Sequence, residues 1–303
     1  MRNICLYHRN CTDGKMAAYV MSLWLSRGDL ETEYVDVNYG EDMPDVTDCH
    51  VYIVDFSYKP EVLKQASKVA LSITMLDHHL TAAQQWGGYF TASGVYDLAC
   101  PNYISIREDR SGAGMALEYI LDKDPAVYHK RLLSIVSAVQ DRDLWLFRLP
   151  DTKVIFEAIN GLEGDFNVQM GRLIYDYTEE KYQSLLTKAK ISLELRERLA
   201  SDYVEHASMI KYNGHVVPVI NIPPNFTSRV GELLANEHPF AIIYNIKGDK
   251  VNCSLRSNNK SGIDVSEIAK QRGGGGHKHA SGFRISMTEL VEMLSSTVEG
   301  ESR

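Results

Sequence analysis

Short apolar runs rich in β-branched residues alternate with helical patterns over roughly the first half of the chain, and this alternation limits the fold more than any other feature. The strand-like runs are 3–7, 32–37, 51–55 and 70–76, and the helical runs are 14–27, 60–66, 114–121 and 126–139. Strands that alternate with helices form parallel sheets, because a parallel connection has to return along the sheet. We therefore predict an α/β domain with a largely parallel sheet and helices on both faces.

Polar side chains stand where three of these predicted strands end. His8 follows the first strand, Asp55 ends the third, and Asp77-His78-His79 follows the fourth. Open α/β sheets bind ligands outside the carboxyl ends of their strands. The three polar groups are therefore predicted to meet in one crevice.

The domain organisation follows from length and from a charged helical stretch. At 303 residues the chain is longer than a typical domain of roughly 100–200 residues. Residues 179–210 carry many charges, with apolar residues at helical spacing. We predict an N-terminal domain over 1–178, a linker helix over 179–210 and a smaller C-terminal α/β domain over 211–303.

Charge is distributed unevenly along the chain. The formal net charge is −8, yet eight basic and only three acidic residues lie between Lys247 and Arg284. Proteins that hold long nucleic acid by bulk electrostatics usually show a strongly basic domain. The pattern disfavours a partner such as long duplex nucleic acid and favours local binding of a small anion.

Cellular context is inferred from the termini, the apolar stretches and the cysteines. Met1-Arg2-Asn3 leads directly into a strand pattern, and no apolar run approaches the roughly 20 residues that cross a bilayer. The five cysteines are scattered and form no CxxC pair, which disfavours a disulfide framework and a structural zinc site. We expect a cytoplasmic protein with no membrane partner. A homodimer is left open.

The turn after the first strand adds further ligand-type side chains. It carries His8, Cys11 and Asp13, and Asp141-Arg142-Asp143 closes a later helical run. Each group alone has an ordinary structural explanation, such as capping or pairing with Arg142. Together they supply the oxygen and imidazole ligands of a pair of divalent ions. Two such ions activate water and neutralise both oxygens of a phosphoryl transfer.

These motifs resemble the DHH phosphoesterase superfamily, named for the triplet present here as Asp77-His78-His79, and the resemblance covers nearly the whole chain. It implies that His8 and Asp55 hold one metal ion, with Asp55 bridging to a second. The second ion would be held by Asp13, His78 and Asp141, although the sequence leaves Asp143 open as an alternative to Asp141. His79 would face the phosphate, and we assign catalysis to His79 and Asp77. The implied cofactors are two divalent ions, Mn²⁺ before Mg²⁺, Fe²⁺ or Zn²⁺.

Cys11 departs from that pattern. It stands where the family commonly has the first of two aspartates, and the spacing from His8 is one residue shorter. A thiolate is a softer ligand than a carboxylate, so the metal preference could shift. We predict that Cys11 is a metal ligand; a nucleophilic cysteine is the rival interpretation.

A second constellation lies near the C-terminus. Four glycines, 273–276, precede His277, and Ser254 and Arg256 share one face of a strand-like run. A flexible linker is the plain alternative. The segment resembles the C-terminal substrate-binding domain associated with DHH proteins. The residues expected to bind substrate are Ser254, Arg256, Gly274, Gly275, Gly276 and His277.

The resemblance implies a hydrolase of phosphoric ester bonds that acts on short nucleotide substrates through water activated by two metals. Members of this kind include nanoRNases, phosphoadenosine-phosphate phosphatases, cyclic dinucleotide phosphodiesterases and RecJ-type exonucleases. An exopolyphosphatase and a catalytically impaired nucleotide sensor remain alternatives. A base-stacking residue would separate the first alternative from a nucleotide hydrolase, and Tyr103, Tyr244 and Phe226 are the candidates.

Overall fold

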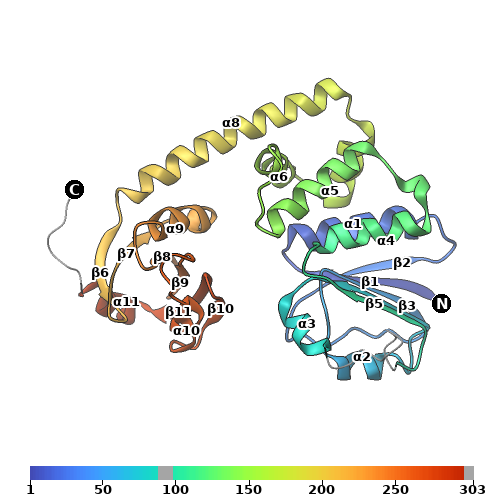
Figure 1. The fold of residues 1–303 in the computed structure, drawn as a ribbon, viewed down its shortest axis with the longest axis horizontal. Coiled ribbons are helices and arrows are strands. Elements are labelled where there is room, and N and C mark those ends of the chain that lie inside the picture. The colour runs from blue at the N-terminus through green and yellow to red at the C-terminus, as the bar shows by residue number, and fades with distance from the viewer. Residues whose placement is uncertain (88–97, 297–303) are drawn as a thin grey trace. The chain divides into compact units, whose positions relative to one another are not determined.

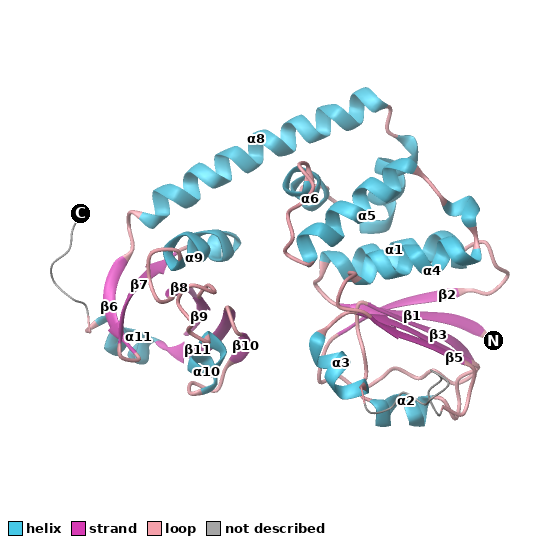
Figure 2. Cartoon of the chain, viewed as in Figure 1, coloured by secondary structure: helices cyan, strands magenta, loops and turns pink. Residues whose placement is uncertain are grey.

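The chain forms two compact units, Met1–Lys190 and Ile191–Arg303. The structure is a computed structural model that describes residues 1–87 and 98–296. Figure 1 shows the course of the chain, and Figure 2 separates its helices from its strands. None of the helices in the described residues combines the length and the apolar character needed to cross a bilayer.

Unit 1 is built on a five-stranded sheet in which every pair of neighbours is parallel. Its order is β2-β1-β3-β4-β5. The strands are β1 (Arg2–His8), β2 (Thr32–Val37), β3 (Cys49–Val54), β4 (Ser72–Asp77) and β5 (Asn102–Ile106). The predicted parallel α/β architecture is confirmed. β5 was missed by the sequence prediction, and β4 starts two residues later than expected.

Helices cover both faces of this sheet (Figure 2). One face packs against α1 (Thr12–Leu25), α4 (Gly112–Lys123) and α5 (Lys130–Asp143). The other packs against α2 (Pro60–Ala66) and α3 (Leu80–Trp86). β4 is buried on both faces, so Ile73, Met75 and Leu76 are buried without alternation and Thr74 is buried between them.

The helical run predicted over 126–139 is split in two. A 3₁₀ turn, Pro125–Val127, ends before Tyr128, and α5 starts at Lys130. The ring of His129 accepts a hydrogen bond from the backbone N–H of Arg131 and so caps the new helix. The chain continues through α6 (Thr152–Asn160), α7 (Phe166–Gly171) and a π-helical turn, Arg172–Asp176.

A long helix, α8 (Glu179–Val204), contains the boundary between the units. It ends earlier than the predicted 210, because residues 208–212 form β6 and pair with β7. All five cysteines are free thiols.

Unit 2 contains a six-stranded mixed sheet of order β10-β11-β9-β8-β7-β6. Its strands are β6 (Ser208–Tyr212), β7 (His215–Asn221), β8 (Ala241–Lys247), β9 (Lys250–Arg256), β10 (Gly275–His277) and β11 (Ala280–Ser286). One apolar cluster joins the sheet to α10 (Val265–Lys270) and α11 (Met287–Leu294). A second joins it to α9 (Thr227–Ala235), which follows a 3₁₀ turn, Pro224–Phe226.

Candidate metal centre

The strand order of unit 1 places the predicted residues at one position in the sheet. β1 lies between β2 and β3, so the chain leaves β1 toward one edge and builds the other edge from β3 onward. Ligands bind at such a topological switch point, outside the carboxyl ends of the strands. His8 is the last residue of β1, Asp55 follows β3, and Asp77 is the last residue of β4. The predicted meeting of the three strand ends is confirmed.

Asp55 lies at the centre of this region and is held in an unusual backbone conformation. Its φ is 55°, in the left-handed region that residues other than glycine rarely adopt. Only 1% of Asp55 is exposed. A Cβ on Gly112 would lie 2.4 Å from the Asp55 Cβ, and one on Gly14 would lie 3.0 Å from its Oδ2. Glycine at these two positions therefore leaves the space that Asp55 occupies.

Asp13, in the first turn of α1, is fixed by the N-terminus of α4. Its Oδ1 accepts hydrogen bonds from the Ser111 hydroxyl at 2.7 Å and from the Ala113 N–H at 3.1 Å. Its buried Oδ2 has no hydrogen-bond partner within the described residues. Ser111 was missed by the sequence analysis; its signal was its place as the N-cap before the helical run at 114–121.

His78 faces three carboxylates at once. Its Nε2 lies 3.0 Å from Asp55 Oδ1, 3.3 Å from Asp143 Oδ2 and 3.9 Å from Asp13 Oδ2. One imidazole nitrogen cannot form ideal hydrogen bonds to all three oxygens. The arrangement suits a cation that those side chains would share.

His79 is oriented by Asp77. Asp77 is fully buried, and its Oδ1 lies 2.7 Å from His79 Nδ1 while also accepting the N–H of His78 at 2.8 Å. His79 is one-quarter exposed at its side chain. The buried Asp77 holds the ring of His79, and catalysis by Asp77 itself stays a prediction.

Cys11 lies beside His8 and Asp55. The three residues each offer one ligand atom, and these atoms lie within 4.8 Å of one another. Cys11 is the N-cap residue of α1, but its side chain makes no capping hydrogen bond. The structure brings the thiol to the place that the sequence predicted.

In the described residues, the ligand atoms of two further groups also lie within 4.8 Å of one another: Asp55, His78 and His79, and Asp13, His78 and Asp143. Three of the buried atoms directed into this region, His8 Nδ1, Asp13 Oδ2 and Asp55 Oδ2, have no hydrogen-bond partner in the described part of the chain. Burying such atoms unpaired is costly. The donor set of the three groups is three imidazoles, three carboxylates and a thiol, and it fits a pair of divalent ions.

Asp141 is the one predicted ligand in unit 1 that the structure places elsewhere. Its carboxylate accepts the N–H groups of Arg148 at 2.9 Å and Leu149 at 3.0 Å, and also the Thr152 hydroxyl. These bonds fix the chain that follows α5. Asp143 lies in the cluster instead, so the choice of Asp141 over Asp143 is corrected.

The crowding of charges changes the titration of these groups. Burial, with the nearby carboxylates of Asp55 and Asp143, raises the pKa of Asp13 well above its usual range. Burial disfavours the charged form of His78, but its bond to Asp55 and the other carboxylates outweigh burial and raise its pKa to about 9. For Asp55, burial is likewise outweighed by the bond from His78, and its pKa lies below the usual range.

These shifts predict pH-dependent metal binding. Below about pH 9 the metal-free protein holds a proton on His78 that a cation must displace. One linked proton makes Mn²⁺ affinity rise roughly tenfold per pH unit, levelling off above the folded pKa. In the metal-free protein, the stabilisation from charged His78 is complete below its unfolded pKa of about 6.5 and is lost as the pH rises through about 9.

Calorimetric titration with Mn²⁺ across this range, in buffers of different ionisation enthalpy, measures both the affinity and the proton released. His78→Asn is expected to flatten the slope. An affinity that does not change with pH would contradict the linkage.

The predicted substrate residues of unit 2 lie on two elements. Ser254 and the cation Arg256 are on β9, and the glycines lie at the start of the β10–β11 hairpin. Arg256 is half-buried on β9, where its guanidinium donates to the Leu255 carbonyl at 2.9 Å and to the Ser228 hydroxyl at 3.3 Å. Burial lowers its pKa. Within the described residues, none of the ion pairs that the structure shows includes Arg256. Ser254 lies on the same strand, opposite Gly282.

The second half of the glycine cluster lies in a strand, so the cluster is not a flexible linker. Gly275–His277 forms β10 and pairs with β11. A Cβ on Gly274 would lie 2.1 Å from the Gly282 carbonyl oxygen, and one on Gly276 would lie 2.6 Å from that of Ala280. Close packing thus requires glycine at both positions, and substrate binding by Gly274, Gly275 and Gly276 stays a prediction. The side chain of His277 lies outside the described residues.

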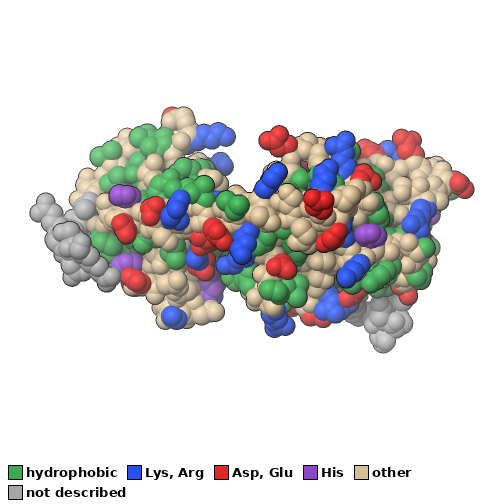
Figure 3. Space-filling view, turned by 90° about the horizontal axis from the view of Figure 1, so that it is seen from above, with side chains coloured by type: hydrophobic (Ala, Val, Ile, Leu, Met, Phe, Trp, Pro, Cys, Tyr) green, Lys and Arg blue, Asp and Glu red, His purple; other side chains and the backbone are tan. Residues whose placement is uncertain are grey.

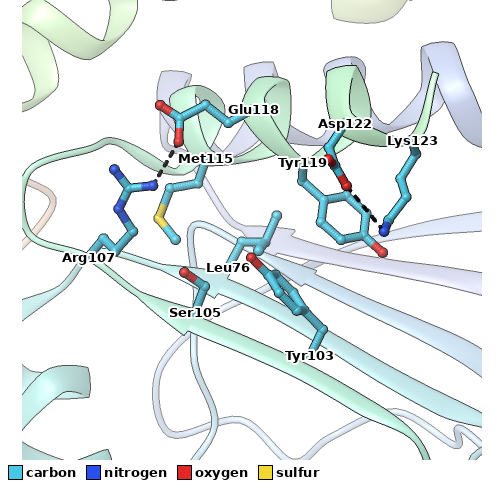
Figure 4. Close-up of a pocket in the computed structure, with 9 residues that line it drawn as sticks. All are labelled: Leu76, Tyr103, Ser105, Arg107, Met115, Glu118, Tyr119, Asp122 and Lys123. Carbon is cyan, nitrogen blue, oxygen red and sulfur yellow. Dashed lines mark hydrogen bonds and ion pairs between the residues drawn. The ribbon is translucent and has the colours of Figure 1, made fainter. Parts of the chain in front are cut away.

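Of the three proposed base-stacking residues, only Tyr103 belongs to the same unit as the metal centre, and it is in none of the ligand groups. Tyr103 is on β5 three residues before its carboxyl end, and it lines a separate cavity of about 150 Å³ with Tyr119, Arg107 and Lys123 (Figure 4). Phe226 packs on Tyr203, and Tyr244 packs against the apolar core of unit 2.

Tyr39, which the sequence analysis missed, lies at the centre instead. Its ring centroid is 5.5 Å from that of His8 and 6.0 Å from that of His79, and the residue is 49% exposed. Phe56 supports the ring at 4.6 Å. Because Tyr39 stands in the loop after β2, periodicity gave no signal for it.

On the face drawn in Figure 3, acidic and basic side chains are interspersed over both units. On this face the charge imbalance of the sequence does not produce one large area of a single sign.

Comparison with known proteins agrees with this geometry. Residues 223–301 match the DHHA1 domain model. An uncharacterized protein of Acanthamoeba polyphaga mimivirus is 27% identical over 332 aligned positions, which cover 98% of this chain and 74% of the relative.

Solved structures of similar fold cover 97% of the chain. A pGpG-specific phosphodiesterase of Vibrio cholerae has a TM-score of 0.54 at 12% identity, with 97% of its own chain covered. An exopolyphosphatase-related protein of Bacteroides fragilis has 0.53 at 14% identity and 90% coverage. The exonuclease RecJ bound to manganese has 0.52 at 14% identity and 89% coverage. The chain therefore combines the fold of the DHH-family phosphoesterases with a C-terminal DHHA1 domain.

Proposed function

We propose that this protein is a metal-dependent phosphohydrolase that cleaves phosphoric ester bonds in short nucleotide substrates. The observation that carries the proposal is the overlap of three ligand groups, two of which share Asp55 and two of which share His78, with three buried ligand atoms left without partners in the described residues. Structural relatives described as a phosphodiesterase and as an exonuclease support the same class of reaction.

Two ion positions are proposed, with Asp55 between them. His8, Cys11 and Asp55 would hold one ion, and Asp13, His78 and Asp143 the other. The two oxygens of Asp55 point in these two directions, since Oδ1 is 3.0 Å from His78 and Oδ2 is 3.8 Å from His8. Divalent ions bound there would lower the pKa of a water molecule and neutralise charge on phosphate oxygens.

His79 is proposed to contact the substrate phosphate. Burial disfavours its charged form, but the hydrogen bond with Asp77 outweighs burial and raises the pKa of His79. Nδ1 of His79 is hydrogen-bonded to Asp77, so Nε2 of His79 is the nitrogen left to donate to a phosphate oxygen. A positively charged ring in this position would stabilise negative charge that develops in the transition state.

Arg256 is proposed as an anion-binding position of unit 2. Arg256 is half-buried and has no carboxylate partner in the described residues, so desolvation of its charge is unfavourable in free energy. An anionic ligand would offset this unfavourable term. Its planar fork matches the oxygens of a phosphate group.

Tyr39 favours a nucleotide over polyphosphate. Aromatic side chains stack on nucleobases whatever the sequence, whereas polyphosphate offers nothing to stack. Tyr39 is half-exposed beside His8 and His79, where a base next to the reacting phosphate would meet it.

The Tyr39→Ala variant is expected to raise KM for a dinucleotide by about tenfold or more, because stacking one base contributes about 1–3 kcal/mol. KM for polyphosphate should stay unchanged. Steady-state kinetics on both substrates measures the difference. Tyr103→Ala is the matched control, since Tyr103 is exposed to a similar extent, 52%, but lies on β5 away from the ligands. Equal effects of Tyr39→Ala on both substrates would favour the exopolyphosphatase alternative.

The proposal is tested by hydrolysis of a dinucleotide, adenosine 3′,5′-bisphosphate, a cyclic dinucleotide and polyphosphate, each with Mn²⁺ and after chelation. We expect turnover of a nucleotide substrate that stops on chelation and returns with Mn²⁺. Turnover of polyphosphate alone would support the alternative hydrolase. Tight binding of nucleotides with no turnover on any of them would identify a sensor.

A further inference from the structure

The two groups of ligands differ in chemical character, and Cys11 makes the difference. One group offers a thiol, an imidazole and a carboxylate from Cys11, His8 and Asp55. The other offers carboxylates from Asp13 and Asp143 and an imidazole from His78. Carboxylates suit Mg²⁺ and Mn²⁺, whereas a thiolate favours Zn²⁺ and Fe²⁺.

In the described residues the Cys11 side chain makes no capping hydrogen bond, although Cys11 stands at the N-cap of α1 and is partly exposed. The backbone N–H of Gly14 is near the sulfur and favours its thiolate form. The other four cysteines are buried within apolar clusters. Cys11 is thus distinguished from them by its surroundings.

An independent observation points to a ligand at the same position. Asp55 is 1% exposed, and its Oδ2 has no hydrogen-bond partner in the described residues. His8 Nδ1, also buried and unpartnered there, lies 3.8 Å from that oxygen. That separation is too long for a hydrogen bond but leaves both atoms free to bind one cation.

We propose that the position formed by His8, Cys11 and Asp55 selects a thiophilic divalent cation, Zn²⁺ or Fe²⁺, while the position of Asp13, His78 and Asp143 takes Mn²⁺ or Mg²⁺. The inference deepens the proposed function and rests on it for the presence of two ions. When the cation binds, the sulfur–hydrogen bond breaks, the proton leaves to solvent, and the sulfur lone pair forms the bond to the metal. No electron is transferred in this step.

Co²⁺ alone, added anaerobically to metal-free protein without substrate, is the probe. A cobalt–thiolate bond gives a near-ultraviolet charge-transfer band that oxygen and nitrogen ligands do not give. We expect the band in the wild type and in Cys100→Ser, and its absence in Cys11→Ser and Cys11→Asp. Zn²⁺ should remove the band, and excess Mg²⁺ should not.

Metal-binding variants separate this inference from its rivals. Cys11→Ser should weaken Zn²⁺ binding by at least the roughly 10–100-fold lost when a metal ligand loses only its outer-shell partner. Cys11→Asp should bind Mn²⁺ more tightly than Cys11→Ser does, because a carboxylate suits that ion. A cysteine that acted only as a nucleophile would leave the Mn²⁺ affinity the same in both variants.

A charge-transfer band that persists in Cys11→Ser, or wild-type protein that binds Co²⁺ without the band, would overturn the inference. The proposed function fails separately. If the protein shows the band but hydrolyses no substrate, the metal-selectivity inference stands and the proposed function is wrong. If it hydrolyses substrate without showing the band, the proposed function stands and the inference is wrong.

Discussion

Asp55→Asn is expected to lower hydrolysis by at least about 10²–10³-fold, the loss that follows removal of one group stabilising transition-state charge. Asp55 is the side chain shared by both proposed ion positions, with one oxygen directed toward His78 and the other toward His8. Asparagine keeps the shape but removes the negative charge between the two cations. Both positions should therefore lose affinity.

The same variant is expected to fold normally. Asparagine is among the few residues that tolerate a positive φ, so the backbone at φ 55° should be retained. Thermal unfolding with and without Mn²⁺ is the readout, because an ion that binds only the folded state raises Tm. The wild type should gain Tm with Mn²⁺ and the variant should gain little.

Asp48→Asn is the matched control for Asp55→Asn. Asp48 has a φ of 54° but is exposed and lies outside the ligand groups. It should leave both turnover and the Mn²⁺-dependent Tm unchanged. Near-normal turnover in Asp55→Asn would show that Asp55 only shapes the turn after β3.

The sequence predicted the features that repeat or that stand at strand ends. Apolar runs, with a period set by the backbone, marked β1, β3 and β4, and the polar residues that followed them had to lie at one edge of a parallel sheet. His8, Asp55 and His78 were found in this way. β5 was missed because Asn102–Ile106 mixes polar and apolar residues on an edge strand.

Features that depend on three-dimensional packing were not predictable. Tyr39 reaches the centre from a loop, where no periodicity fixes a direction. The role of Gly112 follows from the approach of α4 to Asp55, two segments far apart in the sequence. Composition did not reveal that Gly275–His277 forms β10 and pairs with β11.

The choice between Asp141 and Asp143 shows most directly what a sequence pattern alone does not determine. Both lie at the end of α5, and motif order alone favoured Asp141. On an α-helix, two side chains at positions i and i+2 point about 200° apart around the axis, so at most one of them can face the cluster. The side facing the sheet edge is set by the packing of α5, which places Asp143 beside His78 and Asp141 against the chain after the helix.

Paired substitutions are expected to separate these two aspartates. Asp143→Asn should lower turnover and Mn²⁺ affinity by about 10²-fold or more, because it removes a carboxylate from the second ion position. It should not reduce the stability of the metal-free chain. The side chain of Asp143 is one-quarter exposed, and its burial, together with the charge of Asp55, outweighs the attraction of His78 and raises the pKa of Asp143. Its charged form is therefore net unfavourable in the metal-free fold, and removing the charge should not destabilise the chain.

Asp141→Asn should have the opposite profile. The buried Asp141 carboxylate accepts hydrogen bonds from Arg148, Leu149 and Thr152, and an amide NH₂ group in place of one oxygen would face a donor. Loss of a hydrogen bond to a charged acceptor lowers the free energy of unfolding by about 2 kcal/mol. Urea denaturation of metal-free protein, beside Mn²⁺ titration, measures both effects. If Asp141→Asn abolished Mn²⁺ binding at unchanged stability while Asp143→Asn bound normally, the order of the two roles would be reversed.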